Sequence, residues 1–194
     1  MISVITITYN NLSGLKKTVS SVIKYSGFSE SVINELIVVD NLSIDGTDLF
    51  MRKLTNTNIS LNYHRESDFG VYDAMNKGIK LASGDLIGIL NSDDMFEDVN
   101  VISQIVNSIG DYDAIYSDLC YVKQDDTNKI IRYWKSGEFT DSSFENGWMA
   151  PHPTLFVKKE IFEKFGMYNI ELSNSADYEF ILRVFYKYKV KVKY

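Results

Sequence analysis

The 194-residue chain contains one cysteine and two prolines. A single cysteine excludes a disulfide framework and a cysteine-based zinc finger, and a reducing compartment is the simplest fit. Cys120 lies in an apolar, strand-like stretch, where we expect it to fill buried space. No stretch reaches the ~20 apolar residues of a membrane span, and no signal-peptide pattern follows Met1. We therefore expect a cytoplasmic protein, which is compatible with peripheral contact at the inner face of the cytoplasmic membrane.

Basic residues are fewer than acidic residues. The chain has 20 Lys and Arg residues against 26 Asp and Glu residues, for a net charge of −6. Proteins that bind nucleic acid carry a basic surface, so we expect no nucleic-acid partner. No P-loop and no Gly-x-Gly-x-x-Gly motif occurs, which argues against a P-loop NTPase and a Rossmann dehydrogenase. The composition is otherwise that of an ordinary globular domain.

Apolar runs alternate with stretches of helical periodicity through about residue 122. Strands are predicted at 3–8, 36–39, 59–63 and 86–90, and helices at 12–23, 47–54, 71–82 and 99–109. This alternation predicts an α/β fold with a Rossmann-like, mostly parallel sheet flanked by helices.

The second part of the chain is less regular. We expect one strand over 114–122, an irregular and functional segment over 123–149, a short strand at 154–157, and helices at 159–165 and 178–186. Residues 188–194 alternate Tyr or Val with Lys, as in an exposed edge strand. Because nothing follows to cover that strand, we expect the natural chain to continue beyond Tyr194.

The apolar run 86–90 leads almost directly into Asp93 and Asp94. Adjacent carboxylates at the end of a buried strand are costly unless they hold something positive. Ligands in open α/β sheets lie at the carboxyl ends of the strands. The pattern predicts a metal site that clamps a phosphorylated ligand. The alternative is a turn in which an Asp caps the next helix.

Two further polar groups follow predicted strands. They are Thr8-Tyr9-Asn10 and Asp40-Asn41. In a parallel sheet these groups and the Asp93-Asp94 pair line one edge, and their donors, acceptors and aromatic face suit a nucleobase and ribose. The alternatives are that Asn10 only caps the following helix and that Asp40 only turns the chain.

Other candidates lie on helices and in a constrained loop. Asp73 and Lys77 are four residues apart on one helical face and are expected to pair, and Lys77 lies where it would meet phosphate charge. His152 stands between two prolines that restrict its backbone, which makes a functional role about as expected as a structural one. Asp177 opens a predicted helix, where it either complements the helix dipole or acts as a general base.

Taken together and in this order, these motifs resemble a family 2 glycosyltransferase with the GT-A fold. The resemblance rests on residues 3–10 (Ser-Val-Ile-Thr-Ile-Thr-Tyr-Asn), 37–41 (Ile-Val-Val-Asp-Asn), 70–78 (Gly-Val-Tyr-Asp-Ala-Met-Asn-Lys-Gly), 90–94 (Leu-Asn-Ser-Asp-Asp) and 176–179 (Ala-Asp-Tyr-Glu). The segment 72–78 most resembles the branch that builds bacterial O-antigens, capsules and related polysaccharides.

The resemblance implies roles for these residues. Thr8, Tyr9 and Asp40 would contact uridine, Asp93 would reach the ribose or the metal, and Asp94 would ligate Mn²⁺ or Mg²⁺. Asp177 would be the catalytic base of an inverting transfer. The remaining candidates for the nucleotide-sugar site are Asn10, Asn41, Asp68, Asn76, Lys77, Asn91 and His152.

Two departures from the family pattern affect the donor site. Asn41 stands where many members have a second Asp, and Met75 replaces a frequent Arg, which shifts the expected diphosphate contact to Lys77. We expect one GT-A domain over 1–194, with a nucleotide-sugar-binding part at 1–122 and a smaller acceptor-side part at 123–194 that is truncated at its end.

The implied activity is transfer of a hexose from a UDP-sugar to a hydroxyl of a glycan or lipid-linked acceptor. A binding module that holds a nucleotide-sugar without turnover is one alternative. A sugar-phosphate nucleotidyltransferase is another, although residues 10–17 lack the Gly-rich basic loop that such an enzyme would need.

Overall fold

The computed structural model describes residues 1–26, 33–54 and 57–194. Its first half alternates strands and helices as the sequence predicts: β1 (Ile2–Thr8), α1 (Leu12–Ser26), β2 (Ile33–Asp40), α2 (Thr47–Lys53), β3 (Ser60–Arg65), α3 (Val71–Leu81), β4 (Leu86–Ile89) and α4 (Val101–Ile109). Among these described residues, no helix combines the length and the apolar character that a membrane crossing requires.

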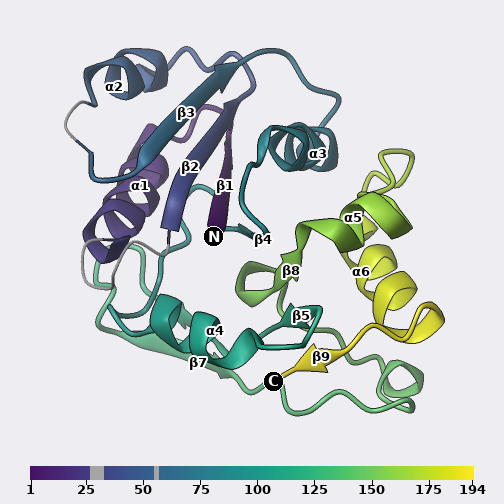
Figure 1. The fold of residues 1–194 in the computed structure, drawn as a ribbon. Helices are drawn as coiled ribbons and strands as arrows, with labels where there is room; N and C mark the ends of the chain where they lie inside the picture. Colours follow the sequence, from purple (N-terminus) through teal and green to yellow (C-terminus); the bar gives the residue numbers. More distant parts are fainter. Residues whose placement is uncertain (27–32, 55–56) are drawn as a thin grey trace.

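Seven strands form one mixed sheet in the order β3-β2-β1-β4-β8-β5-β9 (Figure 1). The first four strands are parallel, and β8 (Phe156–Lys158) runs antiparallel to both of its neighbours. The edge strand β9 (Val192–Lys193) is parallel to β5 (Ala114–Ile115). Because β8 lies between β4 and β5, which both precede it in the chain, the parts predicted at 1–122 and 123–194 share this sheet.

Helices cover both faces of the sheet and enclose two apolar layers (Figure 1). Helices α1, α2 and α4 pack on one face, while α3, α5 (Lys159–Phe165) and α6 (Ala176–Ile181) pack on the other. Successive side chains of β1 point to opposite faces of the sheet. Val4 therefore packs in the layer under α1, α2 and α4, and Ile5 packs in the layer under α3, α5 and α6. Gly78 allows α3 to approach β1 closely, since a Cβ there would lie 2.4 Å from the Ile5 side chain.

The prediction of one strand over 114–122 is wrong. The chain forms β5, turns at Ser117 and Asp118, and then forms β6 (Leu119–Val122) in a separate two-stranded sheet. The turn is stabilised by side chains: the Ser117 amide donates to Thr154 Oγ1 at 3.2 Å, and Asp118 accepts from the Ser136 amide at 2.8 Å. Apolar composition alone does not show where a strand changes sheets.

The expectation of an irregular segment over 123–149 is wrong in part. It contains β7 (Ile130–Trp134), which pairs with β6 as an antiparallel hairpin, and a short 3-10 turn (Phe144–Asn146). Another 3-10 turn (His152–Thr154) precedes β8, so that strand begins two residues later than predicted. The last helical segment begins at Ala176 and continues after Ile181 as a π-helix (Leu182–Lys187).

A buried glutamate that no sequence pattern predicted joins the strands near their amino ends. Glu35 on β2 is 4% exposed and accepts hydrogen bonds from the Ser3 hydroxyl, the Ser83 amide and hydroxyl, and the Asn62 side chain. Burial raises the pKa of Glu35, but the hydrogen bonds from Ser3 and Ser83 outweigh it and leave the pKa below 4.5. Its carboxylate therefore joins β1, β2, β3 and the end of α3.

We expect Glu35→Ala to lower the free energy of unfolding by at least about 2 kcal/mol, because it leaves buried donors without an acceptor. The pKa of Glu35 is lower in the folded state, so its contribution is present above pH 4.5 and is lost as the pH falls through the folded pKa. Urea denaturation at several pH values measures both effects. Glu160→Gln, which neutralises an exposed glutamate on α5, is the control. Equal acid sensitivity of the wild type and Glu35→Gln would contradict the role of Glu35.

Candidate functional site

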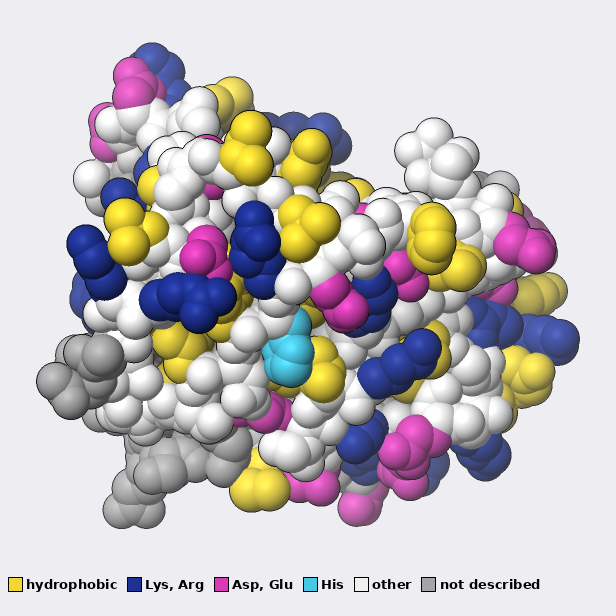
Figure 2. Space-filling view, turned by 90° about the horizontal axis from the view of Figure 1, so that it is seen from above, with side chains coloured by type: hydrophobic (Ala, Val, Ile, Leu, Met, Phe, Trp, Pro, Cys, Tyr) yellow, Lys and Arg dark blue, Asp and Glu magenta, His cyan; other side chains and the backbone are white. Residues whose placement is uncertain are grey.

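The three polar groups predicted to share one edge of the sheet meet at the carboxyl ends of β1, β2 and β4. Thr8 is in register with Asp40, and the Asn41 amide donates to the Thr8 carbonyl at 3.1 Å. The Ser92 amide donates to the Ile7 carbonyl at 3.2 Å. Figure 2 looks down on this edge and shows acidic, basic and exposed hydrophobic side chains interspersed across it.

A pocket of about 360 Å³ opens at this edge. Its walls come from all three strand ends, the loop before α3 and the first turns of α3: Ile7, Thr8, Tyr9, Asn41, Asp68, Gly70, Val71, Ala74, Asn91 and Ser92. Within the described part of the chain, Thr8 Oγ1 and Asn91 Oδ1 are buried without a hydrogen-bond partner, as is Thr6 Oγ1 deeper in β1. Buried polar atoms are rarely left unpaired, so the two at the pocket indicate a place where a ligand supplies the missing bonds.

Asp40 follows β2 and is fully buried, with both carboxylate oxygens engaged by the protein itself. Oδ1 accepts from the Ser43 amide at 3.0 Å and from the Ser43 hydroxyl, and Oδ2 accepts from the Tyr63 hydroxyl at 2.7 Å. Burial raises the pKa of Tyr63, and the bond to Asp40 raises it further. Asp40 therefore fixes the loop beside the pocket, while direct contact with uridine stays a prediction.

The helix α1 is capped by Asn11 rather than by Asn10. Asn11 caps the helix, because its Oδ1 accepts from the Gly14 amide at 3.1 Å. Asn10 has a positive φ of 48° and accepts from the Ile44 amide at 2.9 Å, which connects it to the loop after β2. Tyr9 is 63% exposed at the pocket.

Asp93 and Asp94 form a turn directly after the pocket wall at Ser92. Helix α4 begins only at Val101, so neither aspartate caps it. Burial, and then the charge of Asp93, raise the pKa of Asp94 to about 6. Neither carboxylate has a hydrogen-bond or ion-pair partner among the described residues. Gly14 permits this arrangement, since a Cβ there would lie 2.8 Å from the Asp93 Cβ.

The two uncompensated carboxylates suit a divalent cation that a ligand helps to hold. The described residues contain no group of three His, Cys, Asp or Glu side chains that would enclose a metal. Mg²⁺ commonly binds through one or two carboxylates together with substrate phosphates, and Mn²⁺ shares its preference for oxygen ligands. Asp93 and Asp94 fit that pattern, and their role as ligands stays a proposal.

The loop before α3 is tied to the pocket by Asp68. Its amide donates to Asn41 Oδ1 at 3.2 Å, its carboxylate accepts from the Gly70 amide at 2.9 Å, and burial raises its pKa. The predicted pair between Asp73 and Lys77 is confirmed at 3.3 Å. Lys77 also donates to the Ser67 carbonyl, so its ammonium stabilises this loop.

Asn76 lies on the buried side of α3, away from the loop that precedes it. Its side-chain amide donates to the Tyr168 carbonyl at 2.8 Å, and its Oδ1 accepts from the Tyr168 amide at 3.0 Å. Both ends of the side chain are therefore used to attach α3 to the segment after α5.

Asp177 lies in the first turn of α6, which packs in the same apolar layer of the sheet as α3. Its Oδ1 accepts from the Tyr72 hydroxyl at 2.8 Å. Close by, His152 Nε2 and the Tyr168 hydroxyl are 2.9 Å apart, and both side chains are buried. Burial lowers the pKa of His152, and the charge of Asp177 opposes that shift. Sequence reasoning missed Tyr72 and Tyr168; the only available signal was the place of Tyr72 in the 70–78 motif.

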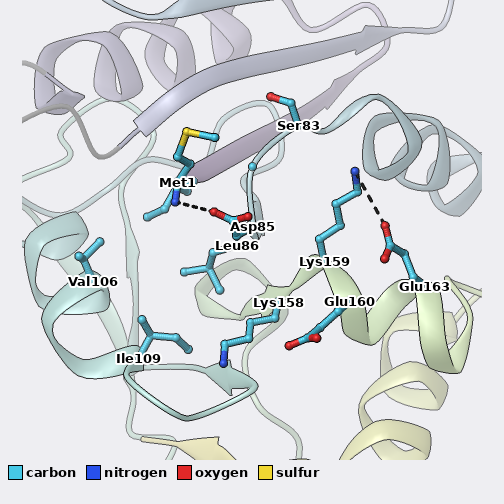
Figure 3. A pocket seen from close by; sticks show the side chains of 12 residues that line it. Met1, Ser83, Asp85, Leu86, Val106, Ile109, Lys158, Lys159, Glu160 and Glu163 are labelled. Carbon is cyan, nitrogen blue, oxygen red and sulfur yellow. Dashed lines mark hydrogen bonds and ion pairs between the residues drawn. The ribbon is translucent and has the colours of Figure 1, made fainter.

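A second pocket, of about 630 Å³, lies at the opposite edge of the sheet (Figure 3). It surrounds the amino ends of β1 and β4 and contains none of the predicted site residues. Several of its charges pair with one another: the Met1 amino group lies 3.1 Å from Asp85, and Lys159 lies 4.0 Å from Glu163. Among the described residues, the buried oxygens without a partner that line a pocket, on Thr8 and Asn91, belong to the smaller pocket and not to this one.

The sequence of the chain matches a family model. The model is Glycosyl transferase family 2, and the match covers residues 3–173. The chain belongs to glycosyl transferase family 2.

Curated relatives of this family agree with the assignment. An uncharacterized glycosyltransferase of Mycobacterium tuberculosis is 35% identical over 186 residues, which covers 94% of this chain and 68% of the relative. A PGL/p-HBAD biosynthesis glycosyltransferase of Mycobacterium bovis is 30% identical over 152 residues, which covers 78% of this chain and 58% of that protein.

Solved structures show the same fold at low sequence identity. The mannosyltransferase PcManGT from Pyrobaculum calidifontis, in complex with GDP-Man and Mn²⁺, has a TM-score of 0.74 at 18% identity over 99% of this chain. TarS 1–349 of S. aureus, in complex with UDP-GlcNAc, has a TM-score of 0.74 at 16% identity over 98%. The expected GT-A fold is confirmed. The chain spans about half the length of these two structures, 53% and 54%.

Asn76 offers a test between a scaffold role and direct contact with the donor. We expect Asn76→Ala to lower the free energy of unfolding by about 2–4 kcal/mol, because two buried main-chain groups lose their partners. Urea denaturation and calorimetric titration with UDP measure stability and affinity in parallel. Lys80→Ala, on the exposed face of the same helix, is the control. Lost UDP affinity with unchanged stability would show that Asn76 contacts the donor.

Proposed function

We propose that this protein transfers a hexose from a nucleotide-diphosphate sugar to a hydroxyl group, with inversion at the anomeric carbon. The observation that carries the proposal is the pocket at the carboxyl edge, where unpaired buried oxygens of Thr8 and Asn91 lie next to the uncompensated pair Asp93 and Asp94. A nucleoside with a diphosphate and a cation would satisfy both features at once.

Uridine diphosphate is the proposed nucleotide. Tyr9 and Thr8 come from β1, Asn41 from the end of β2 and Asn91 from the end of β4, so an aromatic face and several hydrogen-bonding groups surround the pocket. The two solved relatives carry GDP-Man in one case and UDP-GlcNAc in the other, which supports the class of nucleotide-diphosphate sugars. The choice of uridine rests on the sequence resemblance.

Asp93 and Asp94 are the proposed ligands of Mn²⁺ or Mg²⁺. When bound, such an ion neutralises charge on the diphosphate and makes it a better leaving group. The protein contributes a pair of carboxylates whose mutual repulsion and partial burial favour a positive partner. Lys77, held at the loop before α3 by Ser67 and Asp73, is the proposed positive charge for the diphosphate.

Asp177 is the proposed general base. The acceptor oxygen forms a bond to the anomeric carbon while the bond from that carbon to the diphosphate oxygen breaks. The proton of the acceptor hydroxyl goes to Asp177, and the nucleoside diphosphate leaves. Asp177 lies on the α6 side of α3, whereas Val71 and Ala74 of the same helix line the donor pocket, so the start of α3 separates base from nucleotide.

The proposed acceptor is a glycan or a lipid-linked glycan in the assembly of a surface polysaccharide. Residues 123–194 supply Asp177 and the segments around it, and this part is proposed as the acceptor side. A relative named for PGL/p-HBAD biosynthesis supports a role in building a glycoconjugate.

Asp94→Asn tests the metal and the donor together. We expect metal-dependent UDP affinity to fall by more than about 100-fold, because losing even a residue that supports a metal ligand costs about 10–100-fold. Calorimetric titration of UDP with Mn²⁺ and with EDTA measures this, and GDP serves as the competing nucleotide.

Glu97→Gln removes one negative charge three residues further on and is the matched control. Unchanged affinity in Asp94→Asn would contradict the metal role of Asp94. Tighter binding of GDP than of UDP would overturn the choice of uridine while leaving the donor class intact.

Asp177→Asn tests the base. We expect kcat to fall by about 10²–10⁴-fold while UDP affinity stays the same, because a base acts on the acceptor proton in the transition state. Release of UDP from UDP-sugars, measured with a panel of hydroxyl acceptors, gives kcat. Glu171→Gln, an exposed carboxylate before α6, is the control. Near-normal turnover with slightly lower stability would leave Asp177 as a helix-start residue.

A further inference from the structure

A side-chain hydrogen bond joins the first turn of α3 to the first turn of α6. The Tyr72 hydroxyl donates to Asp177 Oδ1 at 2.8 Å, across 105 positions of sequence. Asp177 Oδ2 has no hydrogen-bond partner in the described ranges of the chain. One carboxylate oxygen is therefore held in place and the other is left open.

We propose that Tyr72 is a positioning residue that orients the Asp177 carboxylate for proton abstraction. The inference rests on the proposed function of Asp177 as the base. A hydroxyl that donates to a carboxylate stabilises the charged form, and it also selects one rotamer of the side chain. The helix dipole of α6 favours the negative charge but does not select which oxygen faces the acceptor.

The ring of Tyr72 is held by the aromatic side chains beneath it. Its centroid lies 5.9 Å from that of Tyr168, and Tyr168 in turn lies 5.0 Å from Phe180. Tyr168 is buried, and its hydroxyl pairs with His152. Because these rings limit the movement of Tyr72, its hydroxyl has a fixed place from which to hold Asp177.

The other groups around Asp177 do not duplicate this bond. His152 approaches from the 3-10 turn before β8, burial lowers its pKa, and its Nε2 lies 2.9 Å from the Tyr168 hydroxyl rather than at Asp177. The Tyr168 hydroxyl is engaged with His152. On the same helical segment, Arg183 pairs with Glu179 at 2.7 Å. Among the described residues, Tyr72 is thus the one donor of a hydrogen bond to the Asp177 carboxylate.

The place of Tyr72 on α3 also relates the base to the donor. Gly70, Val71 and Ala74 line the pocket at the carboxyl edge, and Tyr72 lies between them in the chain. The same helical turn therefore presents one side to the proposed nucleotide-sugar and the other to the proposed base. A bond to Asp177 from this turn fixes the base relative to the donor rather than only to its own helix.

Tyr72→Phe tests the inference, because it removes the hydroxyl and keeps the ring. We expect kcat to fall by about tenfold while KM for the donor stays the same, because the freed carboxylate spends less time in the orientation that accepts the acceptor proton. UDP affinity should not change. The matched control is Tyr133→Phe, which removes a similar bond of 2.6 Å to Asp118 on the β6–β7 hairpin.

A second measurement needs no substrate. With ¹³C-labelled aspartate, the carboxyl signal of Asp177 is assigned by its loss in Asp177→Asn and is compared between variants by NMR. We expect its chemical shift to change in Tyr72→Phe and to stay in place in Tyr133→Phe. The Asp118 signal should change in Tyr133→Phe and stay in place in Tyr72→Phe, because the Tyr133 hydroxyl donates to Asp118.

An unchanged Asp177 signal in Tyr72→Phe overturns the inference. A changed signal with an unchanged kcat overturns it too, because the bond would then have no part in the reaction. Normal turnover in Asp177→Asn instead overturns the proposed base, and the inference falls with it. Loss of turnover in Asp177→Asn, together with the changed signal and the lower kcat in Tyr72→Phe, supports the proposal.

Discussion

The parallel register of β1, β2 and β4 is the constraint on which the site depends. Main-chain bonds between these strands place Thr8 opposite Asp40 and bring Ser92 beside Ile7. Polar residues that are far apart in sequence therefore converge on one edge. The close packing of α3 on β1 at Gly78 then adds the helix that forms the remaining wall. Without this register, neither the pocket nor the position of α3 would follow.

Around the pocket, some polar side chains are hydrogen-bonded within the protein and others have no partner among the described residues. The carboxylate of Asp40 and the amide of Asn76 have their bonds within the protein, so they stabilise the loops and helices around the pocket. Thr8 and Asn91 have buried oxygens with no partner in the described chain, and the pKa of Asp94 is raised by burial and by Asp93. A ligand gains most by binding these unpaired groups, because the free energy cost of removing them from water is already present in the free protein.

Much of the fold and the clustering of site residues was predictable, because both depend on local patterns. Alternating apolar runs and helical periods identified the strands from β1 to β4, and the rule for parallel sheets placed Asp93 and Asp94 beside Thr8. Long-range hydrogen bonds were not predictable in this way. No local pattern joins Glu35 to Ser83, or Tyr72 to Asp177, because each bond depends on how separate elements pack. The hairpin of β6 and β7 was missed for another reason: the apolar run over 114–122 does not show where the chain leaves one sheet for another.

A crystal structure of the protein with UDP and Mn²⁺ would locate the donor site directly. We expect electron density for the nucleoside in the pocket lined by Thr8, Asn41 and Asn91, with the diphosphate and the metal beside Asp93 and Asp94. Density for the nucleotide at the amino ends of the strands, in the pocket around Asp85 and Lys158, would contradict this placement of the donor.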